Sequence, residues 1–165
     1  MKSKKVWLLS GIPGSGKSTW VQQQVAKYGG VWCSRDLIRF AMLDEGDAYF
    51  SKEDDVFDSW ISQIREALNN PEVEDIYIDA THISNRSRFK TLRRLPKENI
   101  EKITNVVFTV PLGICLERNA KRTGRELVPE EIIKGMHMCC EAPDRYNTIY
   151  IDERGEIIGQ NLCDL

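Results

Sequence analysis

The segment Gly11–Thr19 has the residue types and the spacing of a loop that binds phosphate groups. It reads GIPGSGKST and matches the pattern GxxxxGK[ST], whose glycines let successive backbone N–H groups surround a phosphate. In this pattern Lys17 reaches the β- and γ-phosphates, Ser18 binds Mg²⁺ and Thr19 bonds a further phosphate oxygen. We expect a nucleoside-triphosphate site; the alternatives are a chance glycine-rich turn and a loop that binds a nucleotide without chemistry. The expected nucleotide ligands in the loop are Gly14, Ser15, Gly16, Lys17, Ser18 and Thr19.

A carboxylate and a guanidinium stand three residues apart in the segment SRDLIR at 34–39. Ser34 can cap a helix that places Asp36 and Arg39 on one face. If the preceding strand ends near the γ-phosphate, Asp36 can accept the proton of an attacking hydroxyl, and Arg39 can bind an anionic group of the acceptor. The other interpretation is a capped helix with an ordinary surface ion pair. The nearby phosphate loop favours the catalytic interpretation.

The sequence DATH at 79–82 follows a short apolar run and predicts a strand end beside the phosphate loop. Asp79 would stand at the carboxyl end of that strand, where a carboxylate can order Mg²⁺. Thr81 and His82 are candidates for contacts with the acceptor. In the alternative, Asp79 or Thr81 caps the next helix, and His82 is a loop histidine with backbone partners.

Basic residues cluster in the segment ERNAKRTGR at 117–125. Arg118 and Arg122 are four residues apart, on one face of a helix end that Gly124 breaks. We expect Arg122 first, and Arg118 second, to belong to a lid that neutralises the phosphoryl group in transfer, with the role of Arg125 left open. The alternative is a solvated helix end that complements the helix dipole.

Short apolar runs alternate with stretches of helical period, which is typical of an α/β fold with a parallel sheet. We expect one domain over residues 1–165, with strand order 2-3-1-4-5, helices on both faces and an arginine-bearing lid. The tail, 147–165, predicts a terminal strand or a small hairpin. The expected buried strands are Val6–Leu9, Val31–Cys33, Ile76–Ile78 and Val106–Val110.

The stretch 86–97 is unusually basic and also carries an apolar stripe. Phe89, Leu92 and Leu95 have the spacing of a helix face that packs on a sheet. The basic residues either line a path for a polyanionic acceptor or form a solvated helix face. They are Arg86, Arg88, Lys90, Arg93, Arg94 and Lys97. The four tryptophans, Trp7, Trp20, Trp32 and Trp60, favour core packing over base stacking.

The composition predicts a globular chain in the cytoplasm. The chain has 165 residues, 23 Lys and Arg, 25 Asp and Glu, and 41% hydrophobic residues, which excludes disordered, collagen-like and coiled-coil proteins. The longest apolar stretch, 106–116, is interrupted by polar and turn residues, and the N-terminus lacks a secretory apolar segment, so we expect no membrane span. Five cysteines without a CxxC motif are expected to be free thiols.

The motifs GIPGSGKST, SRDLIR, DATHIS and RNAKRTGRELVPEEII together resemble the kinase module of phage-type polynucleotide 5′-hydroxyl kinases. The resemblance runs in order from Val6 to about Pro143. It implies ATP as donor, Mg²⁺ as cofactor and, as acceptor and partner, a single-stranded nucleic acid with a 5′-hydroxyl end. It further implies Asp36 as general base, Arg39 as ligand of the 3′-side phosphate, and Arg122 as the lid arginine on the donor. Lys17, Asp36 and Arg122 are thus the catalytic candidates.

Two features depart from that family. His82 stands where an asparagine is often found, and the chain has neither the length nor the DxDxT motif of the phosphatase domain in bifunctional members, so kinase activity alone is expected. Suitably placed NKxD and DxxG motifs, typical of switch GTPases, are also missing from the sequence. Two alternatives stay open: a phosphate-loop kinase acting on a small molecule or aminoacylated tRNA, and a regulatory module that hydrolyses ATP slowly. The sequence determines neither whether the nucleic acid is DNA or RNA nor the oligomeric state.

Overall fold

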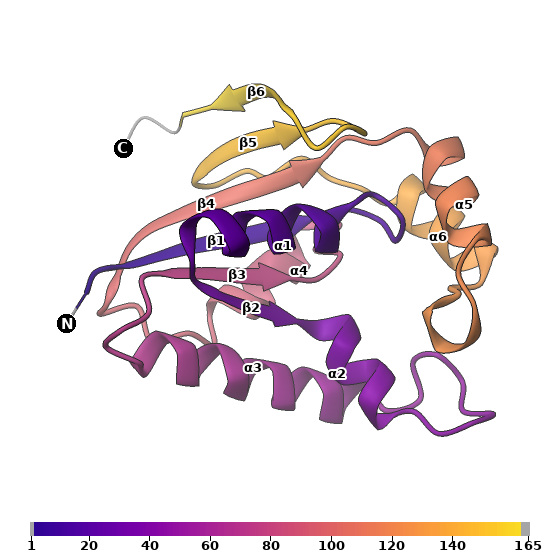
Figure 1. Ribbon diagram of the computed structural model, residues 1–165, viewed down its shortest axis with the longest axis horizontal. Helices are drawn as coiled ribbons and strands as arrows, with labels where there is room; N and C mark the ends of the chain where they lie inside the picture. The colour runs from indigo at the N-terminus through magenta and orange to yellow at the C-terminus, as the bar shows by residue number, and fades with distance from the viewer. Residues whose placement is uncertain (1, 163–165) are drawn as a thin grey trace.

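The computed structural model describes residues 2–162, which form a six-stranded sheet in the order β2-β3-β1-β4-β5-β6 (Figure 1). The first five strands along the chain are parallel, and β6 pairs antiparallel with β5. The predicted fold and strand order are therefore confirmed. Cys163 and the end of the predicted 147–165 extension lie outside the described residues. The strands are β1 (Lys4–Ser10), β2 (Val31–Ser34), β3 (Asp75–Asp79), β4 (Ile100–Phe108), β5 (Asn147–Ile151) and β6 (Ile157–Asn161).

Helices cover both faces of the sheet, and each face has its own hydrophobic core (Figure 1). Residues of α3 and α4 pack on one face against Val6 and Leu8, while residues of α1, α5 and α6 pack on the other face against Leu9 and Val106. Side chains alternate between the faces along a strand, so the apolar run Val6–Leu9 of β1 contributes to both cores. The helices are α1 (Lys17–Tyr28), α2 (Arg35–Met42), α3 (Glu53–Asn69), α4 (Asn85–Leu92), α5 (Leu112–Ala120) and α6 (Glu130–Met138), with a 3₁₀ turn, η1 (Gly124–Glu126).

The longest helix, α3, shows how sequence pattern becomes packing. Its residues Trp60, Ile64 and Leu68, four apart, are at most 1% exposed. Burial of each such side chain contributes about 1.5–3 kcal/mol. The indole Nε1 of Trp60 donates a hydrogen bond of 2.9 Å to the carbonyl of Cys33, which fixes α3 against β2. This packing holds the first turn of α3 next to the carboxyl end of the sheet.

Some predicted packing differs in the structure. Leu92 and Leu95 are buried, but Phe89 is 55% exposed, so the expected apolar stripe is incomplete. The helix α4 ends at Leu92, and Leu95 packs into the core from the turn that follows. Phe89 and Leu95 therefore do not belong to one helix. The fourth strand begins at Ile100 rather than Val106 because its early residues already pair with β1.

Trp20 and Trp60 are buried as expected, whereas Trp7 and Trp32 are half-buried and hydrogen-bonded to Asp75 and Asp79.

The four described cysteines, Cys33, Cys115, Cys139 and Cys140, are free thiols, as predicted. Within residues 2–162, no helix combines the length and the apolar character that a membrane span requires.

Candidate nucleotide and acceptor sites

The phosphate loop connects β1 to α1 at the carboxyl end of the sheet. Gly14 and Gly16 have φ angles of 84° and 92°, which favour glycine, and a Cβ on Gly14 would lie 2.5 Å from the carbonyl oxygen of Cys115. The backbone N–H of Gly11 donates to the carbonyl of Thr81 at 2.8 Å, which ties the loop to the segment after β3. The side-chain oxygen of Ser15 is buried without a partner among the described residues. A loop of this shape, with an unpaired hydroxyl, fits a phosphate group.

Lys17 begins α1 and is buried inside this loop. Its Nζ donates hydrogen bonds to the carbonyls of Gly11 at 2.8 Å and Ile12 at 3.2 Å. Burial lowers the pKa of Lys17, although the charges of Asp79 and Asp36 oppose that shift. A cleft of about 240 Å³ opens in front of the ammonium, and we call it the donor cleft. It is lined by the loop, by β2 and α2, and by Arg122 and Glu126 from the segment after α5.

The residues of the donor cleft fit a nucleotide with Mg²⁺. Ser18 and Thr19 are exposed and place hydroxyls on its wall. The described residues contain no cluster of three or more metal-binding side chains, and Mg²⁺ at phosphate sites is usually held by one or two protein groups together with the phosphates. Ser18 would hold this ion, which would neutralise phosphate charge when bound. Asp79, the other predicted ligand, is 5% exposed and does not line the cleft.

Asp79 ends β3 and pairs in register with Ser34 at the end of β2. Its Oδ2 accepts a hydrogen bond of 2.9 Å from Nε1 of Trp32, a residue of the donor cleft. Burial raises the pKa of Asp79 to about 6; Lys17 and the Trp32 bond oppose the shift, and the charge of Asp36 adds to it. An ion or ammonium beside this buried carboxylate would favour its charged form.

Asp36 lies between two cavities. Ser34 caps α2 as predicted, because its Oγ accepts a hydrogen bond of 3.2 Å from the N–H of Leu37. This cap places Asp36 in the first turn, where it lines both the donor cleft and a second cavity of about 180 Å³. We call the second cavity the acceptor pocket. It is lined by Pro13, Arg35, Asp36, Arg39, Tyr49, Phe50, Glu53, Ala80, Thr81 and Met136.

Arg39 is 5% exposed and connects Asp36 to α3. Its Nε and Nη2 donate to the two carboxylate oxygens of Glu53 at 3.0 and 2.8 Å, and its Nη1 donates to Asp36. Burial alone would lower the pKa of Arg39, but the Glu53 bond and the Asp36 charge raise it. The pKa of Glu53 falls despite its burial because Arg39 and Arg35 bind it. Asp36 and Arg39 thus meet as the spacing predicted.

Seven of the ten residues of the acceptor pocket were not among the predicted site residues, and three of these, Tyr49, Phe50 and Glu53, contact Arg39. The ring centroids of Tyr49 and Phe50 lie 4.7 Å apart. The guanidinium carbon of Arg39 lies 4.9 Å from the ring centroid of Tyr49. The Tyr49 hydroxyl lies 3.5 Å from Oδ1 of Asp36. Two adjacent aromatic residues in an otherwise polar loop are the signal that points to this part of the site.

The arginine-bearing segment reaches the donor cleft, but not as a continuous helix. Helix α5 ends at Ala120, so Arg122 lies two residues beyond the helix on which it was expected to share a face with Arg118. The side chain of Asn119 causes the turn, because its amide donates to the carbonyl of Val128 at 2.8 Å and accepts from its N–H at 3.1 Å. Arg122 still lines the cleft.

The neighbouring arginines hold the segment in place. Nη1 of Arg118 donates to the carbonyl of Gly14 at 3.2 Å, and its Nη2 donates to that of Glu153 at 2.7 Å. Arg125, whose role the sequence left open, donates to the carbonyl of Phe40 at 2.6 Å and so joins the lid to α2.

Thr81 lines the acceptor pocket, whereas His82 does not. The ring of His82 is 3% exposed; its Nδ1 lies 2.7 Å from the carbonyl of Leu9 and its Nε2 lies 2.9 Å from Oγ1 of Thr91. Burial lowers the pKa of His82 to about 3. With both ring nitrogens engaged inside the protein, His82 fits the alternative of a loop histidine with internal partners.

A family model described as an AAA domain matches residues 6–143, which span the phosphate loop, both cavities and the lid. The chain belongs to the AAA domain family. Solved structures with the same fold include a sugar kinase from Janibacter sp. HTCC2649, with 20% identity and a TM-score of 0.63 over 92% of this chain and 86% of that one. They also include a gluconokinase from Sinorhizobium meliloti 1021, with 18% identity and a TM-score of 0.59 over 92% and 84% of the two chains.

A chain of the Pnkp1/Rnl/Hen1 RNA repair complex has 25% identity and a TM-score of 0.68, over 84% of this AAA domain protein and 44% of that chain. The first two likenesses are to kinases of small molecules and show the fold; the third is to part of an RNA repair assembly. Family and fold together support phosphoryl transfer by a phosphate-loop kinase. The acceptor is open between a polynucleotide and a sugar.

Proposed function

We propose that this protein transfers the γ-phosphoryl group of ATP to the 5′-hydroxyl end of a single-stranded polynucleotide. The observation that carries the proposal is the position of Asp36, whose carboxylate lines both the donor cleft and the acceptor pocket. A base that serves phosphoryl transfer must reach the acceptor hydroxyl while that hydroxyl faces the γ-phosphate. Simple hydrolysis would not need a second cavity on the far side of the carboxylate.

Each residue of the site has a separate role in the proposed transfer. Asp36 accepts the proton of the acceptor hydroxyl as its oxygen bonds to the γ-phosphorus, and the bond from phosphorus to the β,γ-bridging oxygen breaks to release ADP. Lys17 and Arg122 neutralise the charge on the phosphoryl oxygens during transfer. Ser18 and Asp79 would hold Mg²⁺, and the backbone at Gly14–Gly16 would bind the phosphates.

The acceptor pocket favours a nucleotide over a sugar. Tyr49 and Phe50 place two aromatic rings in the wall, and aromatic rings stack on nucleobases. Arg39 has five N–H groups, and its bonds to Asp36, Glu53 and Tyr49 occupy four of them. The remaining N–H is available to a phosphate of the acceptor, while the other bonds keep Asp36 oriented.

An acceptor screen tests the proposal. Purified protein with Mg²⁺ and γ-labelled ATP is given a 5′-hydroxyl oligonucleotide, the same oligonucleotide with a 5′-phosphate, gluconate or aminoacylated tRNA. We expect label only on the 5′-hydroxyl strand, with an acceptor KM that rises steeply with salt because phosphate contacts release counterions. Label on gluconate or tRNA alone would assign the protein to the other kinases with this fold, and free phosphate alone would indicate a regulatory ATPase.

A further inference from the structure

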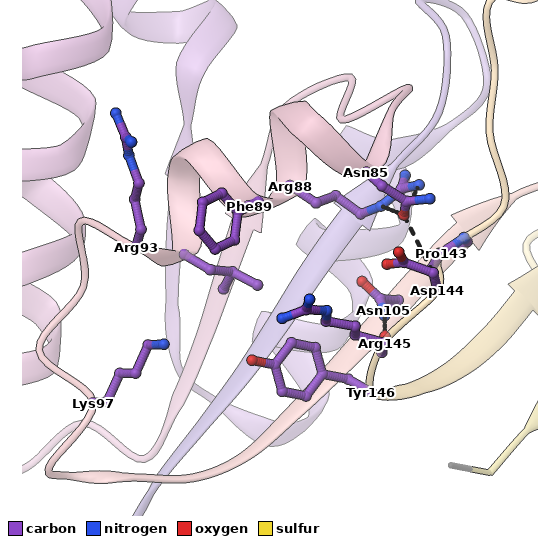
Figure 2. Close-up of a pocket in the computed structure, with 11 residues that line it drawn as sticks. Asn85, Arg88, Phe89, Arg93, Lys97, Asn105, Pro143, Asp144, Arg145 and Tyr146 are labelled. Carbon is purple, nitrogen blue, oxygen red and sulfur yellow. Dashed lines mark hydrogen bonds between the residues drawn. The ribbon is translucent and has the colours of Figure 1, made fainter.

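A small pocket lies on the face of the sheet that α4 covers, away from the phosphate loop (Figure 2). It has a volume of about 130 Å³ and separates α4 from the segment that leads into β5. We call it the α4 pocket. The residues that carry the argument are Phe89, Arg93, Lys97, Asn105, Arg145 and Tyr146, and none of them lines the donor cleft or the acceptor pocket. We infer that the α4 pocket binds a nucleotide of a single-stranded polynucleotide, outside the transfer site.

The pocket is positively charged. Its wall contains four cationic residues against the single carboxylate of Asp144. Arg88 is not available to a ligand, because it is buried and bonded to Asn85 and to the carbonyls of His82 and Glu141. The other cations differ in this respect: Arg93, Lys97 and Arg145 are exposed and form no salt bridge with any described residue. Free cations around a small pocket fit an anionic ligand.

Aromatic rings stand on opposite walls of the α4 pocket. Figure 2 shows Phe89 on α4 and Tyr146 across from it, with the guanidinium of Arg145 between them and Lys97 at the lower edge. Phe89 is 55% exposed, although its neighbour Leu92 packs into the core. Tyr146 has a φ of 66°, a left-handed conformation that is rare for a bulky side chain and is often found at functional sites. Phe89 is exposed and Tyr146 is half-buried against the core, and aromatic rings among cations are typical of surfaces that stack single-stranded bases.

A buried acceptor atom adds an independent observation. Asn105 is 1% exposed, and its Nδ2 donates a hydrogen bond of 2.7 Å to the carbonyl of Arg145, which identifies the nitrogen of the amide. Its Oδ1 is buried without a partner among the described residues. In Figure 2 this oxygen points away from the Arg145 bond, in the wall of the pocket. The N–H groups on the edge of a nucleobase are donors that would satisfy it.

The size and the surroundings indicate a strand rather than a compact ligand. Pockets for drug-sized molecules measure about 300–1,000 Å³, so the α4 pocket takes a single small ring system. A wider groove of about 530 Å³ shares Lys97, Arg145 and Tyr146 with it and adds one cation, Lys102, and one carboxylate, Glu101. A polynucleotide with one base in the pocket could therefore continue along the groove. The inference deepens the proposed function, on which it rests for the identity of the strand.

Direct binding tests the inference without catalysis. Fluorescence anisotropy with a labelled single-stranded oligonucleotide, without ATP, compares the wild type with Lys97→Gln/Arg145→Gln and with Phe89→Ser. We expect the double variant to raise the Kd and to reduce the slope of log K against log salt by about 1.4, because two phosphate contacts are lost. Phe89→Ser should raise the Kd about tenfold with an unchanged slope, because it removes stacking. The matched control, Lys27→Gln/Lys134→Gln, removes two exposed cations elsewhere and should leave the Kd and the slope unchanged.

A transfer assay separates this inference from the proposed function. The double variant should raise the KM for a long 5′-hydroxyl strand and leave that for a dinucleotide unchanged, since a dinucleotide is too short to leave the acceptor pocket. Equal strand binding by wild type and variants, or no strand binding by the wild type, would overturn the inference and leave the pocket as a solvent-filled crevice. Strand binding that requires the α4 pocket, in a protein that phosphorylates no strand, would sustain the inference and refute the proposed function.

Discussion

The donor cleft and the acceptor pocket share Asp36 but are built in different ways. The donor cleft has a phosphate loop of consecutive residues, in which Gly14 and Gly16 adopt left-handed φ angles, and side chains of β2, α2 and the lid complete its walls. The acceptor pocket is formed by side chains from segments far apart in the sequence, held by the pair of hydrogen bonds between Arg39 and Glu53. A backbone cradle can recur in proteins that act on different acceptors, whereas a side-chain pocket changes with each substitution. The acceptor pocket should therefore determine which hydroxyl is phosphorylated.

The largest effect is expected on the donor side, at Arg122. Replacing Arg122 with Ala should reduce the rate of transfer on the order of 10³-fold or more, because a cation that neutralises the transferring phosphoryl group is lost. The measurement is a single-turnover rate at saturating ATP. Lys121→Ala is the matched control, since Lys121 is exposed and pairs only with Glu117 among the described residues. A loss of rate below tenfold would contradict the role of Arg122 as the lid cation that neutralises the phosphoryl group.

Asp79 allows a sharper test of the donor cleft through pH. Its pKa of about 6 in the folded protein is above the ordinary 3.8, so ionising it costs folding free energy as the pH rises through this window. Asp79→Asn removes this cost and should stabilise the nucleotide-free protein by about 3 kcal/mol at pH 8, with no difference below pH 4.

Denaturant unfolding across this pH range checks the difference between the two proteins. His82, with a pKa of about 3, makes both less stable as the pH falls below 6.5, and this shared trend cancels in the comparison. A stability difference that does not change with pH would contradict the burial of an ionisable Asp79. In the transfer assay, the same variant should need more Mg²⁺.

Glu53 tests the acceptor side, with a smaller effect. Glu53→Gln removes the charge that binds Arg39 and Arg35, and it should lower the free energy of unfolding by about 1–3 kcal/mol. It should also raise the KM for the acceptor about tenfold while the affinity for ATP stays constant, because Arg39 loses its orientation. Asp54→Asn, at the next and exposed position, is the control. A change in ATP affinity as large as the change in acceptor KM would show that the donor cleft and the acceptor pocket do not act independently.

The donor cleft could be predicted because its determinants are consecutive in the sequence. Nine adjacent residues, from Gly11 to Thr19, specify the glycine positions, the lysine and the hydroxyls. Asp36 and Arg39 were predictable for a similar reason, since one helical turn relates them and Ser34 caps that turn. The alternation of apolar runs and helical stretches was likewise sufficient for the strand order, which follows from local period and from the rules of parallel sheets.

The remaining features depend on contacts between distant residues. Glu53 meets Arg39 fourteen positions away, after a loop whose path no local pattern specifies. His82 is buried because Leu9 and Thr91, on other elements, close around its ring. Phe89 has the spacing of a core residue, but the buried residues of α4 are Arg88, Thr91 and Leu92, so Phe89 lies outside the buried face of the helix. Such features follow from tertiary packing rather than from spacing.

The position of Asp36 between the two cavities is the central claim, and one variant tests it most directly. Asp36→Asn keeps the shape of the side chain and removes its ability to accept a proton. The measurement pairs the affinity for ATP, by fluorescence titration, with the rate of transfer to a 5′-hydroxyl oligonucleotide. We predict an affinity within about twofold of the wild type and a rate that falls by about 10²–10⁴. Transfer at the wild-type rate, or a loss of ATP affinity as large as the loss of rate, would contradict the assignment of Asp36 as the base.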